Sequence, residues 1–169
     1  MRIRRVTTLS DRREFVDLPA RLYADQPLWL APLRRDEFFM MSRRHPFYRH
    51  SDAAFFLLEA GDEVLGRIAV LDHRRWNEHH GTCDAIFTLF EVVDDETAAA
   101  MLFEAAAVWA RDRGLAEIVG PMGMLPADGH GILVEGFDLP PVLGVAYHPA
   151  YYDRLVKAAG FVKATDYLS

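Results

Sequence analysis

Glu91 and His148 are the two side chains whose positions best suit acid–base chemistry. Glu91 lies near the end of the apolar run Phe87–Val93. If this run is a strand of a parallel pair, its C-terminal end faces the crevice in which such sheets bind ligands. A carboxylate there could accept a proton from a substrate. His148 follows the apolar run Val142–Tyr147 and could also be a base. Simpler roles remain open for both, as an exposed glutamate at a strand end and as a polar cap of the next helix.

Other polar clusters give weaker indications. Several histidines lie in Asp72–Thr82, but their spacing matches neither H-E-x-x-H nor a C-x-x-C pair, so we predict a solvated loop and no metal site. The glycine-flanked turn Asp128–Gly131 could offer backbone N–H groups to an anion or a carbonyl, or could be a tight turn without a ligand. The basic, aromatic segment Ser42–His50 could be an exposed loop or a lid that contacts anions. The sequence contains no G-x-S-x-G elbow and no P-loop, so serine hydrolase and NTPase chemistry have no support.

A strand–helix–strand unit must position the glutamate. The apolar, β-branched run Phe87–Val93 predicts a strand buried on both faces. Asp94 and Asp95 are candidate N-caps for the helix that follows, and Gly114 fits its C-terminal end. A second short strand, Leu115–Val119, should then run parallel to the first, in a right-handed crossover. One face of the helix is apolar at three- and four-residue spacing, and it comprises Ala98, Met101, Leu102, Ala105, Val108 and Trp109.

The rest of the chain predicts an antiparallel front to the same sheet. The fold class is therefore α/β (α+β), a mixed central sheet flanked by helices and containing one βαβ crossover. Further strands are expected at Arg2–Val6, Ala53–Ala60, Val64–Leu71, Ile132–Val134 and Phe161–Tyr167. Helices are expected at Asp11–Leu18, capped by Ser10 and interrupted by Pro19, at Leu33–Met41, and at Ala150–Ala159.

The composition limits the classes of function. A chain of 169 residues with 51% hydrophobic and 26% charged residues is long enough for one domain with a substantial core. The net charge of −6 argues against a general nucleic-acid-binding protein. Cys83 is the single cysteine, so no internal disulfide is expected and a cytoplasmic location is favoured. No apolar run approaches the length that spans a membrane.

Three stretches together resemble the GNAT superfamily of acyl-CoA-dependent N-acyltransferases. They are the hairpin AFFLLEAGDEVLGRIAV, the Phe87–Pro121 unit, and the closing run YYDRLVKAAGFVKATDY. The runs GHGILVEGFDLPP and HPAYY also resemble poorly characterised two-module bacterial GNAT-like proteins. By this resemblance, residues 1–169 form a single GNAT-like domain, which could be the N-terminal module of a longer chain.

The resemblance also implies an activity and the residues that perform it. The expected reaction transfers an acyl group from acetyl-CoA or another acyl-CoA to a small-molecule amine. In the superfamily, a strand-end carboxylate often accepts the amine proton, and backbone N–H groups after that strand hold the coenzyme. The resemblance thus supports Glu91 as a catalytic residue, and His148 remains the second catalytic candidate from its position in the sequence. The implied coenzyme-binding residues are Val92, Val93, Thr97, Ala98 and Ala99.

Two departures from the superfamily pattern keep a second hypothesis open. The superfamily has Q/R-x-x-G-x-G/A in its pyrophosphate loop, whereas this chain has three carboxylates, Asp94–Glu96, and no glycine or arginine there. Val156 stands where many members carry the tyrosine that protonates the leaving thiolate. The alternative is therefore a non-catalytic, degenerate GNAT-like module that binds a ligand or packs against a partner domain. The exposed edge of the expected last strand would suit a homodimer or a second GNAT-like domain.

Overall fold

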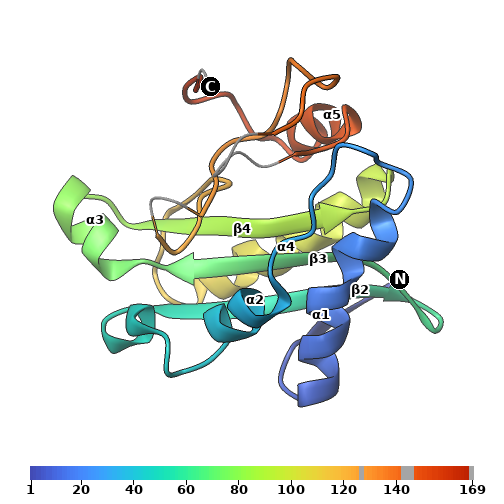
Figure 1. The fold of residues 1–169 in the computed structure, drawn as a ribbon. Helices are drawn as coiled ribbons and strands as arrows, with labels where there is room; N and C mark the ends of the chain where they lie inside the picture. The colour runs from blue at the N-terminus through green and yellow to red at the C-terminus, as the bar shows by residue number, and fades with distance from the viewer. Residues whose placement is uncertain (126–127, 142–146, 168–169) are drawn as a thin grey trace.

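A mixed five-stranded sheet forms the centre of the molecule (Figure 1). The computed structural model describes residues 1–125, 128–141 and 147–167. Within them the strands lie side by side in chain order, and every neighbouring pair is antiparallel except the last pair, β4 and β5, which is parallel. The predicted mixed sheet and its parallel crossover are thus confirmed. The strands are β1 (Arg2–Arg5), β2 (Asp52–Ala60), β3 (Glu63–Asp72), β4 (Asp84–Val92) and β5 (Glu117–Val119).

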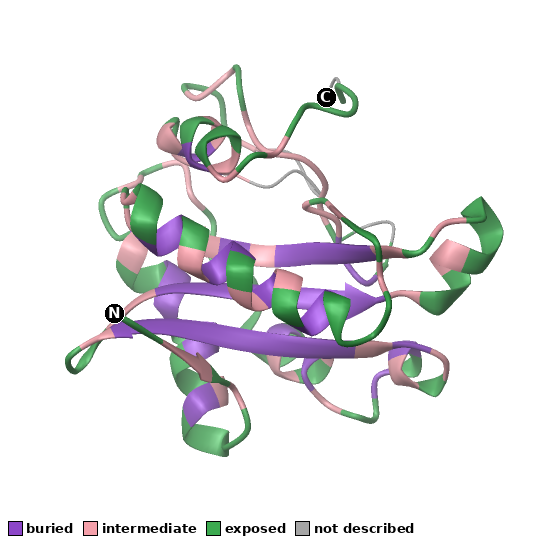
Figure 2. Ribbon diagram, turned by 180° about the vertical axis from the view of Figure 1, so that it is seen from behind, coloured by how far each residue is buried: buried purple, intermediate pink, exposed green. Residues whose placement is uncertain are grey.

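Helices cover both faces of this sheet (Figures 1 and 2). One apolar cluster joins α4 to one face through residues such as Phe87 and Leu102, and a second joins α1 to the other face through Phe15 and Phe55. The short α5 lies beyond the C-terminal end of β4 (Figure 1). The helices are α1 (Leu9–Leu22), α2 (Arg34–Met40), the 3₁₀ turn η1 (Pro46–Arg49), α3 (Arg74–His80), α4 (Glu96–Arg111) and α5 (Tyr151–Ala158).

The first helix begins earlier and ends later than its predicted bounds. Thr8, not Ser10, is its N-cap, because the Asp11 carboxylate accepts from the backbone N–H of Thr8 while Thr8 accepts from that of Asp11. This reciprocal pair is a capping box, which satisfies two donors at once. The helix also continues through Pro19 to Leu22. Proline removes one helical hydrogen bond but does not end a helix whose buried face is held by tertiary packing.

The crossover that carries the glutamate agrees closely with its prediction. Asp95 caps α4 by accepting from the Ala98 N–H at 2.9 Å. Gly66 lies where α4 approaches β3, since a Cβ there would come within 2.8 Å of Leu102 Cδ1 and Val92 Cγ2. The glycine therefore permits close contact between helix and sheet.

Two predicted strands are wrong. Ile132–Val134 and Phe161–Tyr167 are irregular. Phe161 instead places its ring 4.6 Å from that of Phe103, between centroids, and closes the α4 cluster, while Val162 is 89% exposed. Neither run pairs with a strand of the sheet, and a strand needs such a partner for its backbone groups. The last-strand edge proposed for dimerisation is therefore not present.

Two polar segments predicted as loops contain short helical turns. Within Asp72–Thr82, α3 ends at Gly81 in the left-handed conformation. Within Ser42–His50, η1 begins after His45, whose side chain accepts from the Phe47 N–H. Of the apolar run expected before His148, residues 142–146 lie outside the described residues. None of the described helices is both long and apolar enough to cross a bilayer.

Candidate functional site

The site is located where β4 and β5 separate. They pair over only three positions, from Asp84–Glu117 to Ile86–Val119. Gly120 follows with φ = 146° and passes so close to β4 that a Cβ would lie 2.5 Å from the Phe87 carbonyl oxygen. Met122 then donates its backbone N–H to that oxygen, at 3.0 Å. Beyond this point, no strand among the described residues covers that edge of β4.

A bulge lies in the uncovered half of β4. Arg67 of β3 pairs with Glu91 and Ala69 pairs with Thr88, so Leu89 and Phe90 together oppose a single residue. Leu89 has φ = 47°, the only positive φ of a non-glycine among the described residues. Such a bulge bends its strand and redirects its side chains, and bulges are common beside active sites.

A pocket of about 80 Å³ opens against the bulge, and we call it the β4 pocket. The bulge supplies one wall, and the glycine-flanked turn Asp128–Gly131 supplies another. Glu91 and His148, the two predicted catalytic residues, both line it. Residues 57 positions apart in sequence thus lie at one small cavity. The described lining residues are Thr88, Leu89, Phe90, Glu91, Pro121, Asp128, Gly129, His130, Gly131 and His148.

Glu91 is held by a buried guanidinium group. Arg67, whose side chain is 1% exposed, donates from Nε to Glu91 Oε2 at 2.5 Å. Its other nitrogens bind Glu37 of α2, at 3.0 and 3.2 Å. Burial would lower the pKa of Arg67, but the two carboxylates outweigh burial and raise it, so the guanidinium stays charged. Burial in turn raises the pKa of Glu37, against the opposing effect of Arg67.

The proline in α1 explains the remaining bond of Arg67. Pro19 has no N–H to donate to the carbonyl of Phe15, four residues earlier. Arg67 Nη1 donates to that carbonyl instead, at 2.7 Å. The Phe15 carbonyl, which Pro19 leaves without a helical donor, and the buried Arg67 side chain therefore satisfy each other's hydrogen-bonding capacity. Arg67 stands out in the sequence as the single charged residue inside the apolar run VLGRIAV, and this was the signal for a buried charge.

His148 is buried without a hydrogen-bond partner for Nδ1 among the described residues. Its ring packs on Tyr152, with 5.0 Å between centroids. Burial lowers its pKa to about 4, so the imidazole is neutral near pH 7. A buried polar atom without a partner is costly, and its place in a pocket suits a hydrogen bond to a bound molecule.

Two tyrosines of α5 hydrogen-bond both backbone groups of the last residue of β4. The Val92 N–H donates to the Tyr152 hydroxyl at 2.9 Å, and the Tyr151 hydroxyl donates to the Val92 carbonyl at 2.8 Å. Tyr152 also hydrogen-bonds the hydroxyl of Tyr23, at the end of α1, at 2.5 Å. Burial raises the pKa of Tyr152 and of Tyr23, which therefore remain protonated.

The predicted coenzyme residues lie together around the start of α4. Val92 ends β4 and Val93 follows it, Thr97 is exposed, and Ala98 and Ala99 are fully buried against the core. The Ala98 N–H already binds Asp95, as described above.

Arg154 of α5 forms ion pairs with Asp94 and Glu96 at the same turn. No local sequence pattern indicates this partner, because some 60 residues separate it from the turn. Two of the three carboxylates therefore have a cation beside them.

The histidines of the α3 segment have local structural contacts. His73 caps α3 by accepting from the Trp76 N–H, and the His80 ring stacks on Trp76 with 3.9 Å between centroids. Among the residues that the structure describes, no three His, Cys, Asp or Glu side chains gather closely enough to hold a metal ion.

Sequence comparison identifies two bacterial relatives. The chain is 34% identical over 163 residues to "Bacterial ceramide synthase" of Caulobacter vibrioides (strain NA1000 / CB15N), which covers 95% of this chain and 42% of that protein. It is 27% identical over 167 residues to "Protein YghO" of Escherichia coli (strain K12), which covers 99% of this chain and 43% of that protein. The chain thus spans about two fifths of the length of these curated relatives. No family model matches it.

Structural comparison tests the predicted fold. A crystal structure of a probable acetyltransferase superposes with a TM-score of 0.59 at 14% identity, covering 100% of this chain and 95% of the other. That protein and this one therefore share a fold over almost their whole lengths. The chain has a GNAT-like fold, as its strand–helix–strand unit predicted.

Proposed function

We propose that this chain is an N-acyltransferase module that moves an acyl group from acyl-CoA to an amine. The observation that carries the proposal is the β4 pocket, where the strand bulge, Glu91 and His148 meet at the edge that β5 leaves uncovered. The GNAT-like fold supports the same reaction class, but a shared fold alone does not specify an activity.

Glu91, its partner Arg67 and His148 each have a role in this proposal. When bound, acyl-CoA would supply the acyl group as a thioester, which is reactive toward amines. Glu91 would take the proton that the attacking amine loses, directly or through one water. Arg67 would position Glu91, since it fixes one carboxylate oxygen. The neutral His148 would hydrogen-bond a substrate through Nδ1.

The phosphate end of the coenzyme is the harder part to accommodate. Glycine-rich loops hold pyrophosphate through free backbone N–H groups, whereas here Asp95 occupies the Ala98 N–H. Arg154 is the cation beside this turn, and it could exchange Asp94 and Glu96 for phosphate oxygens. We therefore assign the pyrophosphate contact to Arg154 in place of a glycine loop.

The name of the Caulobacter relative suggests the class of acceptor. A ceramide is an amide of a fatty acid with a long-chain amino alcohol, and its synthesis joins an acyl group to an amine. We propose the same chemistry for this chain, with a long-chain amino alcohol as the acceptor. The whole activity could require more chain than these 169 residues, because the match covers 42% of that relative.

Ligand binding and turnover test this function together. Acetyl-CoA and a long-chain acyl-CoA at a hundredfold excess over Kd should stabilise the protein by about 2.7 kcal/mol in thermal unfolding. Glu91→Gln should reduce acylation of a long-chain amino alcohol about a hundredfold or more and leave acyl-CoA binding unchanged. The control, Glu104→Gln, changes a carboxylate that is 65% exposed on α4 and should alter neither quantity. Full turnover by Glu91→Gln would exclude Glu91 as the base.

A second function, a non-catalytic module, is favoured by the contacts of α5. The hydroxyls of Tyr151 and Tyr152 occupy both backbone groups of Val92, and Arg154 binds the adjacent carboxylates. In such a module α5 would permanently fill the place of the coenzyme. Millimolar acyl-CoA would then cause no thermal shift.

Arg154→Gln separates the two functions. It should weaken acyl-CoA binding about tenfold if Arg154 holds pyrophosphate. The control, Lys157→Gln, removes a charge from the same helix without touching that turn, since Lys157 pairs with Asp153.

A further inference from the structure

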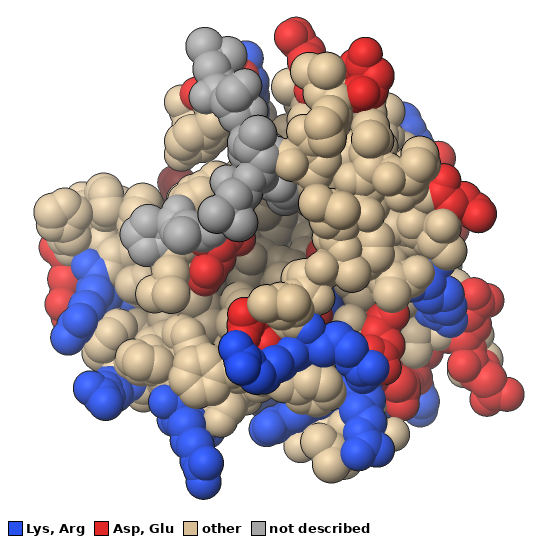
Figure 3. Space-filling view, in the orientation of Figure 1, with Lys and Arg blue, Asp and Glu red and all other residues tan. Residues whose placement is uncertain are grey.

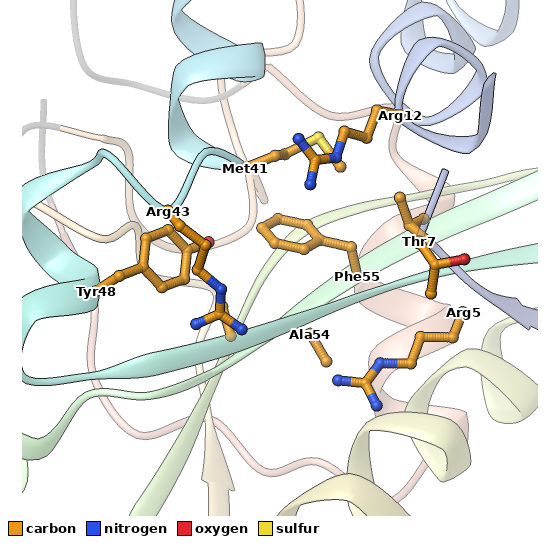
Figure 4. A pocket seen from close by; sticks show the side chains of 10 residues that line it. Arg5, Thr7, Arg12, Met41, Arg43, Tyr48, Ala54 and Phe55 are labelled. Atoms are coloured by element: carbon orange, nitrogen blue, oxygen red, sulfur yellow. The ribbon is translucent and has the colours of Figure 1, made fainter. Parts of the chain in front are cut away.

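A second and larger pocket opens where β1 leaves the sheet (Figure 4). β1 pairs only with the half of β2 from Phe56 to Glu59. Val6 makes one more bond, from its N–H to the Phe55 carbonyl at 2.9 Å, and the chain then turns into α1. Beyond this point β2 continues to Asp52, which leaves a hollow of about 240 Å³ beside it. We call this hollow the arginine pocket.

The arginine pocket combines an apolar floor with a cationic rim. Phe55 and Met41 form part of the floor and are both buried, whereas Ala54, the neighbour of Phe55 in β2, points to the opposite face of the sheet. Arg5, Arg12 and Arg43 come from three different segments, and their side chains lie around Ala54 and Phe55 (Figure 4). No carboxylate is among the described lining residues, although the chain has 25 acidic and 19 basic residues.

The arginines of the rim are largely unneutralised. Neither Arg5 nor Arg12 forms an ion pair within the described part of the chain. By contrast, Arg4, the residue before Arg5, pairs with three carboxylates. Arg43 pairs with Asp52 at 2.8 Å, and Arg113 shares that carboxylate. Lys and Arg also gather over the lower half of the face drawn in Figure 3, while Asp and Glu gather along its right side and top.

We propose that the arginine pocket binds the phosphate head of an amphiphile whose apolar part lies on the floor formed by Phe55 and Met41. Guanidinium groups match phosphate oxygens in geometry, and several of them suit a doubly charged phosphate better than a singly charged carboxylate. The apolar floor favours a ligand with a hydrocarbon part over a free ion. The pocket lies at the β1–β2 edge of the sheet, away from the β4 pocket, so the proposal does not depend on the proposed reaction.

Octyl phosphate, used below its micelle concentration, tests the proposal. Titration followed by amide NMR shifts should move the signals of Thr7 and Ala54 and leave those of the β4 pocket in place. Inorganic phosphate should bind more weakly because it lacks the chain, and octyl glucoside because it lacks the charge. Raising the salt concentration should also weaken binding of octyl phosphate.

Matched double variants test the role of the rim. Arg5→Gln with Arg12→Gln should weaken octyl phosphate binding about tenfold or more. Arg35→Gln with Arg75→Gln removes the same charge from exposed positions outside the pocket and should change affinity less than twofold. Unfolding curves will show that both variants fold. The proposal is overturned if the two variants bind equally, if octyl phosphate binds no better than inorganic phosphate or octyl glucoside, or if its shifts map to Thr88–Glu91.

Discussion

Arg67 is the residue on which the candidate site depends. It is a fully buried charge that binds Glu91, Glu37 and the Phe15 carbonyl, and so joins β3 to β4, α1 and α2. A buried ion pair adds little net stability, but loss of one partner leaves an uncompensated charge. We infer that the role of Arg67 in this protein is to fix the position of Glu91.

His148 should make stability depend on pH. Its folded pKa, about 4, is depressed below the ordinary value of 6.5 by burial. The unfolded chain therefore binds more protons between these values, so this contribution is complete above pH 6.5 and is lost as the pH falls toward 4. We expect it to reach about 3 kcal/mol. Burial raises the pKa of Glu37. Just above the ordinary pKa of a glutamate, the Glu37 contribution to stability should therefore fall as the pH rises, which is opposite to the effect of His148.

The comparison with His148→Phe isolates this effect, because phenylalanine keeps a ring against Tyr152 and does not titrate. Urea unfolding at pH 4.5, 5.5 and 7 should show a smaller loss of stability on acidification in the variant. Parallel pH curves for the two proteins would mean that the histidine is not buried in its neutral form.

At the scale of elements, the separation of β4 from β5 creates the β4 pocket. Gly120 follows the last residue of β5 and lies so close to the Phe87 carbonyl of β4 that no side chain would fit between them. The two strands separate just after this contact. The bulge at Leu89 then turns the uncovered half of β4 toward the pocket.

Gly120→Ala should therefore destabilise the protein by about 2 kcal/mol or more, because the new methyl group would force two backbone segments apart. The matched control is Gly114→Ala. Gly114 also has a positive φ, 72°, but nothing lies within 4 Å of its added Cβ, so only the conformational cost of about 1 kcal/mol is expected. Chemical denaturation measures both, and equal losses would contradict the close approach of β5 to β4.

At the scale of the whole molecule, regular backbone pairing is concentrated in the sheet. β3 is paired along both edges, and β2 is paired along one edge and half of the other; both strands lie between two apolar clusters. The segment 128–141, which forms one wall of the β4 pocket, has a single isolated bridge, Met122–His130. The rigid sheet thus holds Glu91, while a less regular segment closes the pocket above it.

Native-state hydrogen exchange should reflect this division. Amides of β3 should exchange only through global unfolding, whereas those of residues 128–141 should exchange through local opening, at least a hundredfold faster. Mass spectrometry of peptides from the two regions measures the difference. Slow exchange across 128–141 would show that this wall is as rigid as the sheet.

The sequence alone determined the fold class, the crossover and its cap. Periodic apolar residues and Asp95 act locally, so their effects can be predicted without coordinates. It also singled out Glu91 and His148, although nothing local indicated that they line one pocket.

Only the tertiary structure decided which groups meet. The Arg67 network, the tyrosine contacts with Val92 and the ion pairs of Arg154 join residues 24 to 60 positions apart, and no local pattern encodes such distances. The two predicted strands failed for the same reason, since a strand requires a neighbouring edge as well as a suitable sequence. Secondary structure follows largely from local preference, whereas a binding site follows from the packing of segments that are distant in the chain.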